Sequence, residues 1–194
     1  HPDPEFYYKR GGGPMFDMGP YYLTAMINLL GGVQRVFSAS KISFPRRTIT
    51  SQPLAGKVID VDVNTYIAGT VQYASGAIGT IFTTFDVQFP REKSRFIEVY
   101  GSEGTLFVPD PNDFSGTIQL YRPEEGVTKE IPMMYGYPEN SRALGLADMA
   151  KALQTGREAR CAVQQTYHVL EIIEGSRIGG KFKAIFAASF CYDA

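Results

Sequence analysis

The chain has 194 residues, enough for one domain with a substantial core and too few for two full ones. Its 19 Lys and Arg residues nearly balance 20 Asp and Glu residues, so the net charge is −1 and no basic surface is expected to attract nucleic acid. No apolar run approaches the roughly 18 residues that a membrane-spanning helix needs, and we expect a cytoplasmic protein.

The first residues are not typical of a natural start. His1-Pro2-Asp3-Pro4-Glu5 is polar, lacks Met and has no signal-peptide pattern, so we expect further protein to precede it. The two cysteines, Cys161 and Cys191, show neither zinc-site spacing nor a CxxC pattern, which indicates unpaired thiols in a reducing cytosol.

A helix is predicted from Pro14 to about Leu30. The glycines at 11–13 form a turn before Pro14, a residue suited to the first helical position, and Gly31-Gly32 ends the helix. Pro20 has no N–H to donate within the helix, so we predict a kink there.

Segments with two-residue periodicity and many β-branched or aromatic residues follow. The predicted strands are Val33–Phe44, Val63–Ala74, Ala77–Val87, Ser94–Tyr100, Thr105–Val108 and Gly116–Arg122. Short joins with glycine at 74–76 and 101–104 predict antiparallel hairpins. The second and third strands have no charge before Asp86, so both faces of this sheet can be covered, one by helices and one by a second subunit. A Thr-rich face exposed to water is the alternative.

Two helices are predicted near the end of the chain. Ser141 is a suitable N-cap for a helix over Arg142–Thr155, and a second helix covers Val163–Ile178. The first has an apolar stripe formed by Leu146, Met149, Ala150 and Leu153. This order of elements predicts an α+β domain, a large and mostly antiparallel sheet with helices packed on one face. We predict the domain over residues 1–180, with an apolar tail at 181–194 that can add an edge strand.

Four polar residues of the first helix have the spacing of one helix face: Asp17, Tyr21, Thr24 and Asn28. The other positions are almost all apolar, so the helix is expected to be buried, and a buried carboxylate needs partners or a function. Asp17 is also near the predicted N-terminus, where the helix dipole favours its ionised form. Either Asp17 caps the glycine turn while the other three face water, or the four border a cleft in which Asp17 orients a polar substrate.

The segment from Gly11 to Leu23 resembles a family motif. The GGG-x-x-x-D-x-G-x-H segment of the glucose–fructose oxidoreductase and inositol dehydrogenase (Gfo/Idh/MocA) family matches the glycines at 11–13, Asp17 and Gly19, whereas Tyr21 stands at the His position. Residues 1–8, 97–106 and 167–174 also resemble this family, in the same order. The resemblance extends over nearly the whole chain, to about Gly180.

The resemblance implies the substrate-side, C-terminal domain of an oxidoreductase that acts on a sugar or cyclitol hydroxyl or carbonyl by hydride transfer. It also implies a preceding Rossmann domain, which binds NAD or NADP and supplies a catalytic Lys. Because this chain has no strand–GxGxxG–helix unit, we expect it to bind no cofactor alone and to be inactive alone. In this family the sheet often mediates dimer or tetramer contacts, so a homodimer or homotetramer is implied.

Asp17 and Tyr21 are the predicted catalytic residues, since they occupy the Asp and His positions of the motif. A free tyrosine has a pKa of about 10 and needs a neighbouring cation to act as a base. Tyr21 is therefore expected either to relay a proton beside the family Lys or only to hydrogen-bond the substrate. The predicted substrate-binding residues are Arg10, Tyr22, Thr24 and His1.

The remaining titratable residues suggest no metal site. His168, with Glu171 at i+3, is expected to form a pair on the surface of its helix. His1 lies in an irregular leader that either reaches the cleft or is a disordered terminus. The alternative function is a non-catalytic assembly or ligand-binding module with the same scaffold, which Tyr21 in place of His favours.

Overall fold

The computed structural model describes residues 1–87, 97–113, 116–132, 134, 136, 142–177 and 183–184. The chain divides into two compact units, His1–Gln88 with Val163–Ala194 and Phe89–Ala162, which are treated separately below. Every described strand pair is antiparallel, and the helices and strands give the predicted α+β class. No helix in the described ranges is long and apolar enough to cross a membrane.

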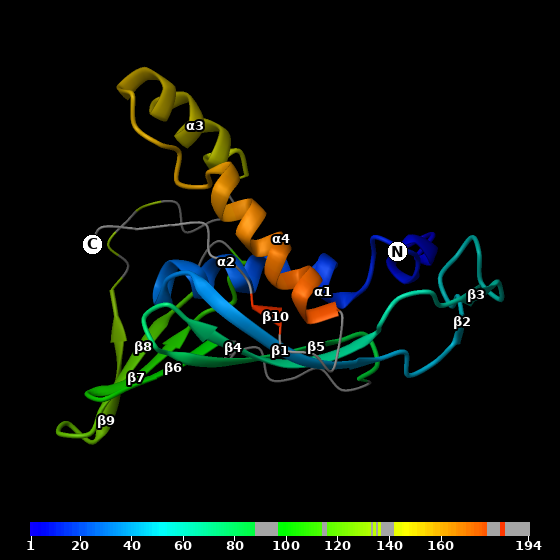
Figure 1. The fold of residues 1–194 in the computed structure, drawn as a ribbon, viewed down its shortest axis with the longest axis horizontal. Coiled ribbons are helices and arrows are strands. Elements are labelled where there is room, and N and C mark those ends of the chain that lie inside the picture. Colours follow the sequence, from blue (N-terminus) through cyan, green and yellow to red (C-terminus); the bar gives the residue numbers. More distant parts are fainter. Residues whose placement is uncertain are drawn as a thin grey trace. The chain divides into compact units, whose positions relative to one another are not determined.

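The first unit is built around one antiparallel sheet with the strand order β10-β1-β4-β5. Its elements are η1 (Glu5–Tyr8), α1 (Pro14–Asp17), α2 (Gly19–Leu30), β1 (Val33–Lys41), β2 (Arg46–Thr48), β3 (Val58–Asp60), β4 (Tyr66–Tyr73), β5 (Ile78–Thr84), α4 (Val163–Arg177) and β10 (Lys183–Ala184). The helices α1, α2 and α4 lie over one face of this sheet (Figure 1). The short β10 pairs with β1, so residues 183–184 of the predicted tail do add an edge strand.

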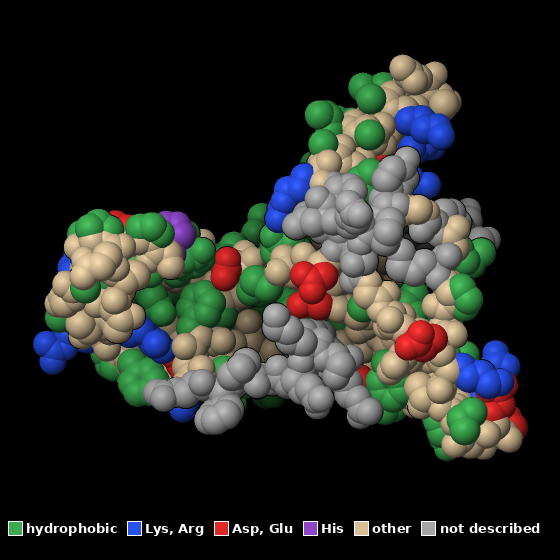
Figure 2. Space-filling model, turned by 180° about the vertical axis from the view of Figure 1, so that it is seen from behind, with side chains coloured by type: hydrophobic (Ala, Val, Ile, Leu, Met, Phe, Trp, Pro, Cys, Tyr) green, Lys and Arg blue, Asp and Glu red, His purple; other side chains and the backbone are tan. Residues whose placement is uncertain are grey.

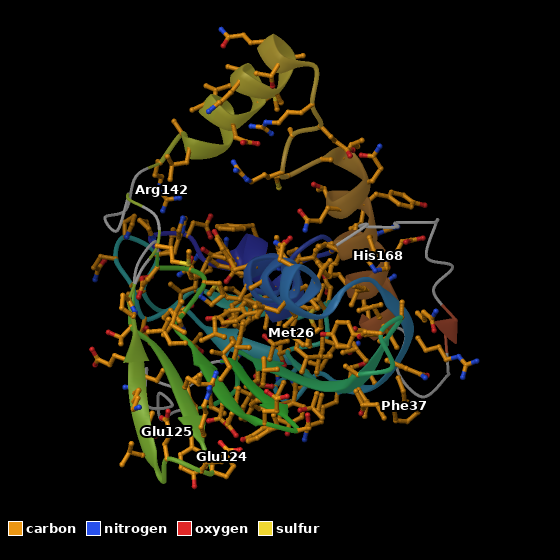
Figure 3. The ribbon with its side chains drawn as sticks, turned by 90° about the vertical axis from the view of Figure 1, so that its left-hand side faces the viewer. Met26, Phe37, Glu124, Glu125, Arg142 and His168 are labelled. Carbon is orange, nitrogen blue, oxygen red and sulfur yellow. The ribbon has the colours of Figure 1, made fainter. Side chains whose placement is uncertain are left out.

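The core lies between these helices and the sheet, because apolar side chains of alternate strand positions meet the apolar helix faces. Its buried members are Leu23, Met26 and Ile27 of α2, Val169, Ile172 and Ile173 of α4, and Val33, Val36, Ile67, Val71, Tyr73 and Ile81 of the sheet. Figure 3 shows Met26 pointing toward the sheet. Burial of each such side chain stabilises the fold by roughly 1.5–3 kcal/mol.

The predicted helix from Pro14 to Leu30 is divided at Met18 into α1 and α2. Pro20 occupies the first turn of α2, where its missing N–H costs no helical hydrogen bond. The Met18 carbonyl accepts the Tyr21 N–H at 3.2 Å and starts the second helix. The predicted interruption near Pro20 is therefore confirmed, and it places Asp17 at the end of a short helix rather than near the start of a long one.

The C-terminal end of α4 is fixed to the sheet by side chains that cap its last carbonyls. The Ser38 hydroxyl donates to the Ser176 carbonyl, and the Asn64 amide donates to the Arg177 carbonyl at 3.2 Å. Ser40 donates to the Arg177 carbonyl as well, at 3.4 Å. The last carbonyls of a helix have no partner within it, so Ser38 and Ser40 of β1 and Asn64 supply hydrogen bonds that they need.

His168 of α4 is buried, which corrects the prediction of a surface pair with Glu171. Its Nε2 accepts the buried Val33 N–H at 2.9 Å, so the neutral ring carries its proton on Nδ1. Nδ1 lies 3.4 Å from a Glu171 carboxylate oxygen, and the pair itself therefore exists. The pattern of i+3 spacing could not show that the ring faces β1, because that contact joins residues far apart in the chain.

The second unit is a four-stranded meander with one helix. It contains β6 (Ile97–Gly101), β7 (Gly104–Val108), β8 (Ile118–Arg122), β9 (Val127–Ile131) and α3 (Leu144–Thr155). The predicted hairpin at 101–104 joins β6 to β7, and Glu124 and Glu125 lie at the turn between β8 and β9 (Figure 3). The predicted strand residues 94–96 and the predicted N-cap Ser141 lie outside the described residues.

The helix α3 forms as predicted, but its apolar stripe is exposed among the described residues. Leu146 and Met149 are exposed, and Leu153 is 82% exposed. Asp148 instead makes ion pairs with Arg157 and Arg160, which tie the helix to the segment that follows it. The helical period thus identified the element correctly, and its apolar stripe lies on an exposed side of the helix.

Replacing His168 with Leu is expected to destabilise the first unit by about 1–3 kcal/mol, because the Val33 N–H stays buried without an acceptor. Urea denaturation followed by circular dichroism measures this free energy. The neighbouring Tyr167→Leu variant is the control, since Tyr167 is 59% exposed and its loss should change stability by less than about 0.5 kcal/mol. Equal midpoints for the two variants would contradict the role of the imidazole.

Candidate functional site

The glycine turn at 11–13 folds the N-terminal leader back against α1. The Gly13 N–H donates to the Tyr7 carbonyl at 2.7 Å, and the Gly12 N–H donates to the Lys9 carbonyl at 2.8 Å. A Cβ atom at Gly12 would lie 2.4 Å from the Phe6 carbonyl oxygen, and Gly13 has a φ of 96°. Only glycine fits these positions without displacement or strain. The motif therefore has a geometric purpose, which is to bring the leader onto the start of α1.

The leader is held from its other side by β3 and the loops next to it. The Asp62 N–H donates to the Tyr8 carbonyl at 2.9 Å, and Lys57 pairs with Glu5 at 2.6 Å. The His1 carbonyl accepts the Ser51 hydroxyl at 2.7 Å, and the His1 ring packs edge-on against Phe6 at a centroid distance of 5.0 Å. Of the two alternatives for His1, the structure shows an ordered leader rather than a disordered end.

A cavity of about 190 Å³ lies where the leader meets α1 and the end of β5, and Tyr7, Tyr8, Asp17 and Phe85 line it. Phe85 packs edge-on against both tyrosines, at centroid distances of 6.1 Å from Tyr7 and 5.7 Å from Tyr8. The surface at this end of the unit shows hydrophobic side chains beside separate acidic groups (Figure 2). The described lining of the cavity thus combines three aromatic rings with one carboxyl group.

Asp17 is half-buried in this cavity, and burial raises the pKa of its carboxyl above the ordinary value. Within the described ranges its carboxylate has no hydrogen-bond or ion-pair partner, so it does not cap the glycine turn. Its backbone N–H donates to the Gly13 carbonyl at 3.0 Å. A half-buried carboxyl that faces a cavity without a protein partner is available to a ligand hydroxyl.

Arg47 of β2 contacts two of the cavity residues, Tyr8 and Phe85, and was not predicted as a site residue. Its guanidinium pairs with the largely buried Asp86, donates to the Phe85 carbonyl at 3.3 Å and stacks over the Tyr8 ring at 5.3 Å. Asp86 also accepts the Thr65 hydroxyl at 2.8 Å. A planar cation between a carboxylate and an aromatic face is a rigid arrangement. No local sequence pattern predicts the role of Arg47, because β2 has only three residues and the partners of Arg47 come from distant segments.

The other predicted site residues are not among the residues that line the cavity. Tyr21 is 42% exposed in the first turn of α2, and Arg10 is exposed just before the glycine turn. Tyr22 and Thr24 are half-buried on α2. The fourth residue of the predicted polar face, Asn28, accepts a hydrogen bond from Gln165 of α4 at 3.0 Å, so it joins two helices. Asp17 is therefore the one member of that face that lines the cavity.

The described residues do not fit a metal or a dinucleotide. No group of three or more His, Cys, Asp or Glu side chains comes together within the described ranges to hold a metal ion. Dinucleotides are bound at the ends of parallel strands that are joined by helices, whereas all strand pairs in the described part of the chain are antiparallel.

Comparison with solved structures shows where this fold occurs. Levoglucosan dehydrogenase in its apo form has a TM-score of 0.74 at 17% identity, over 97% of this chain and 57% of that chain. An NAD binding oxidoreductase from Klebsiella pneumoniae has a TM-score of 0.71 at 19% identity, over 93% of this chain and 53% of that chain. Aldose-aldose oxidoreductase from Caulobacter crescentus, complexed with glycerol, has a TM-score of 0.68 at 21% identity, over 94% of this chain and 52% of that chain.

The chain spans about half the length of these structures, so its fold is that of one half of such oxidoreductases. The model of the GFO/IDH/MocA C-terminal domain matches residues 1–107, and the chain belongs to this family. The predicted resemblance is thereby confirmed. No protein of curated function matches the chain by sequence.

Replacing Gly12 with Ala is expected to destabilise the first unit by about 1–3 kcal/mol, because the new Cβ collides with the leader carbonyls. Urea denaturation measures the loss. Gly32→Ala is the matched control, since the nearest atom would be 3.8 Å from its Cβ, an ordinary contact. If both variants keep the stability of the parent chain, the leader is not held in the described position.

Proposed function

We propose that the chain is the substrate-side domain of an NAD(P)-dependent oxidoreductase that acts on a hydroxyl or carbonyl of a sugar or cyclitol by hydride transfer. The observation that carries this proposal is the place of Asp17, which stands at the Asp position of the family motif and is the charged residue among the described residues that line the cavity. Membership of the family supports it. So do the names of structural neighbours, among them levoglucosan dehydrogenase in complex with NADH and levoglucosan.

The cofactor, NAD or NADP, belongs in this proposal to another part of a longer, cytoplasmic protein. We propose, as the family resemblance implies, that this chain alone binds no cofactor and is inactive alone. Its contribution is to hold the substrate. The Asp17 carboxylate accepts a hydrogen bond from the substrate hydroxyl and orients it for reaction.

Tyr21 has the weaker of its two predicted roles, a hydrogen bond to the substrate from the exposed first turn of α2. Arg10, Tyr22, Thr24 and His1 stay as proposed substrate contacts around the cavity. Of these four, His1 packs on Tyr7, a cavity residue, at a centroid distance of 5.8 Å. Its place in the leader therefore brings an imidazole next to the cavity wall.

Replacing Asp17 with Asn in the full-length protein is expected to lower kcat by about 100-fold, since loss of the group that orients the reacting hydroxyl can cost this much. Steady-state kinetics with a sugar substrate and NAD(P) measures the loss. The matched control is Asp62→Asn, which removes an exposed carboxylate paired with Lys9 outside the cavity. Unchanged turnover in Asp17→Asn would contradict the proposed role.

The same variant is expected to keep or gain stability at pH 7. Burial raises the pKa of Asp17 in the folded state above 3.8, so the carboxyl favours folding most when protonated, and this contribution is lost as the pH rises through the raised pKa. Asn carries no charge and avoids that loss. Thermal denaturation at pH 4 and pH 7 separates this effect from a loss of activity caused by unfolding.

The sheet face opposite the helices supports the proposal of a homodimer or homotetramer. Phe37, Ile78 and Phe82 are exposed on it, while alternate residues of the same strands are buried under the helices. Thr70 pairs with Thr80 between them, and the charged side chains of this face, Arg35 and Lys41, belong to β1. An apolar surface of this kind is typical of a face that another subunit covers.

Phe82→Lys is expected to convert this oligomer to monomers, because a charge on the covered face would be buried without a partner. Size-exclusion chromatography with light scattering gives the mass. Val58→Lys is the control, since Val58 on β3 has a similar exposure, 55% against 53% for Phe82. A monomeric parent chain would exclude the proposed assembly.

A non-catalytic assembly or ligand-binding module is the second candidate. The observation in its favour is Tyr21, a phenol where the family motif has an imidazole. If this candidate is correct, the full-length protein binds a sugar or assembles, but it shows no turnover with either NAD or NADP. The kinetics of the full-length protein therefore distinguish the two functions directly.

A further inference from the structure

We propose that Arg47 is a positioning residue of the substrate site, which acts through Tyr8 and Phe85 by fixing their two rings relative to each other. This inference rests on the proposed function, which assigns the cavity beside Asp17 to a substrate. It deepens that function by giving a role to a residue outside the described lining of the cavity.

Arg47 joins two distant segments that meet at the cavity. Its guanidinium carbon lies 5.3 Å from the centroid of the Tyr8 ring in the leader, and its guanidinium donates to the carbonyl of Phe85, just after β5, at 3.3 Å. The Tyr8 and Phe85 rings pack edge-on against each other with their centroids 5.7 Å apart. One side chain of β2 thus contacts both members of this ring pair, which lines the cavity.

The guanidinium is held by further contacts of its own. It forms an ion pair with Asp86, whose side chain is 7% exposed, and its carbon lies 5.1 Å from the centroid of the Phe44 ring. Asp86 in turn accepts the Thr65 hydroxyl at 2.8 Å, and the oxygen of that hydroxyl accepts the Ser43 N–H at 3.2 Å. The cation therefore has little freedom to move, so it can fix the residues that it contacts.

The chemistry of the Arg47–Asp86 ion pair favours a geometric role over a contribution to stability. Removing two charges from water costs about as much as their attraction returns, so a buried ion pair adds little net stability. An arginine side chain, however, is a planar fork that stacks on aromatic rings while its N–H groups donate to fixed acceptors, which a lysine ammonium cannot do. Arg47 uses both properties, since it stacks on Tyr8 and donates to Asp86 and the Phe85 carbonyl.

The position of the two rings affects the carboxyl of Asp17 in the same cavity. Burial raises the pKa of Asp17, and Tyr8 and Phe85 line the cavity with it. If the two rings move apart, water reaches the carboxyl and its pKa falls toward the ordinary value of 3.8. The titration of Asp17 therefore reports the position of the rings without any substrate.

NMR spectroscopy of the 194-residue chain tests this role with the Arg47→Lys variant, which keeps the positive charge and removes the planar fork. Nuclear Overhauser effects between the Tyr8 and Phe85 ring protons are expected in the parent chain and should be lost in the variant. The pKa of Asp17, followed through the carbon chemical shift of its carboxyl group, should fall toward 3.8. Because the charge is kept, such a fall reports the rings and not the loss of a nearby cation.

Two controls accompany the variant. Arg46→Lys is the matched substitution, since Arg46 is the preceding residue of β2 and is exposed, and it should change neither signal. The Overhauser effect between the Phe6 and Tyr7 rings, whose centroids lie 4.1 Å apart within the leader, should stay intact in Arg47→Lys. If Arg47→Lys keeps both the ring contact and the carboxyl titration of the parent chain, the proposal is wrong.

Asp86→Asn decides the question if Arg47→Lys does not fold, which amide NMR spectra show. The Asn side chain keeps an oxygen for the Thr65 hydroxyl and removes the charge that holds the guanidinium. The Overhauser effect between the two rings should again be lost, and a folded Asp86→Asn that keeps it would overturn the proposal.

Kinetics of the full-length protein separate this inference from the proposed function. Arg47→Lys is expected to lower kcat roughly tenfold with a smaller change in KM, because a misplaced substrate leaves its reactive geometry. If Asp17→Asn lowers turnover as expected while Arg47→Lys leaves kcat and KM unchanged, Arg47 is not a positioning residue and the oxidoreductase stands. If the parent protein turns over no sugar while Arg47→Lys separates the rings, the proposed function falls and the positioning of the cavity by Arg47 stands.

Discussion

The site depends on the close approach of Gly12 to the carbonyls of Phe6 and Tyr7. This contact leaves no room for a side chain, and it allows the leader to turn back onto α1. Without it, Tyr7 and Tyr8 would not lie beside Asp17, and the carboxyl would face either water or the core. The glycine turn is also stabilised by hydrogen bonds of the leader to β3 and its neighbouring loops, so contacts between distant segments hold the leader in place.

The scaffold under the site is held by polar contacts between α4 and β1 as much as by apolar burial. Strand serines and Asn64 satisfy the last carbonyls of α4, and His168 satisfies the Val33 N–H from within the same helix. Apolar packing alone allows a helix to slide over a sheet, whereas directed hydrogen bonds along the helix fix one position of the helix on the strands.

Much of the fold was predictable because its signals are local. Strand periodicity identified β1, β4 and β5, the glycine joins identified two hairpins, and Pro20 marked the break before α2. The site was predictable only at Asp17, through its motif. The role of Arg47 could not be predicted, because its contacts with Tyr8, Phe85 and Asp86 form only when the chain folds. The burial of His168 and the exposure of the α3 stripe could not be predicted for the same reason. A helical period identifies one face of a helix but not the residues that cover that face.

The first unit is assembled from two separated stretches of chain, His1–Gln88 and Val163–Ala194, with the second unit inserted between β5 and α4. During synthesis, β1, β4 and β5 therefore leave the ribosome long before the helix that covers and caps them. Until α4 arrives, the apolar inner face of the sheet has only α1 and α2 for cover, and nascent chains in this state are prone to aggregate. The autonomous β6–β9 meander, built from neighbouring strands, can fold during that interval and shorten the exposed unfolded chain.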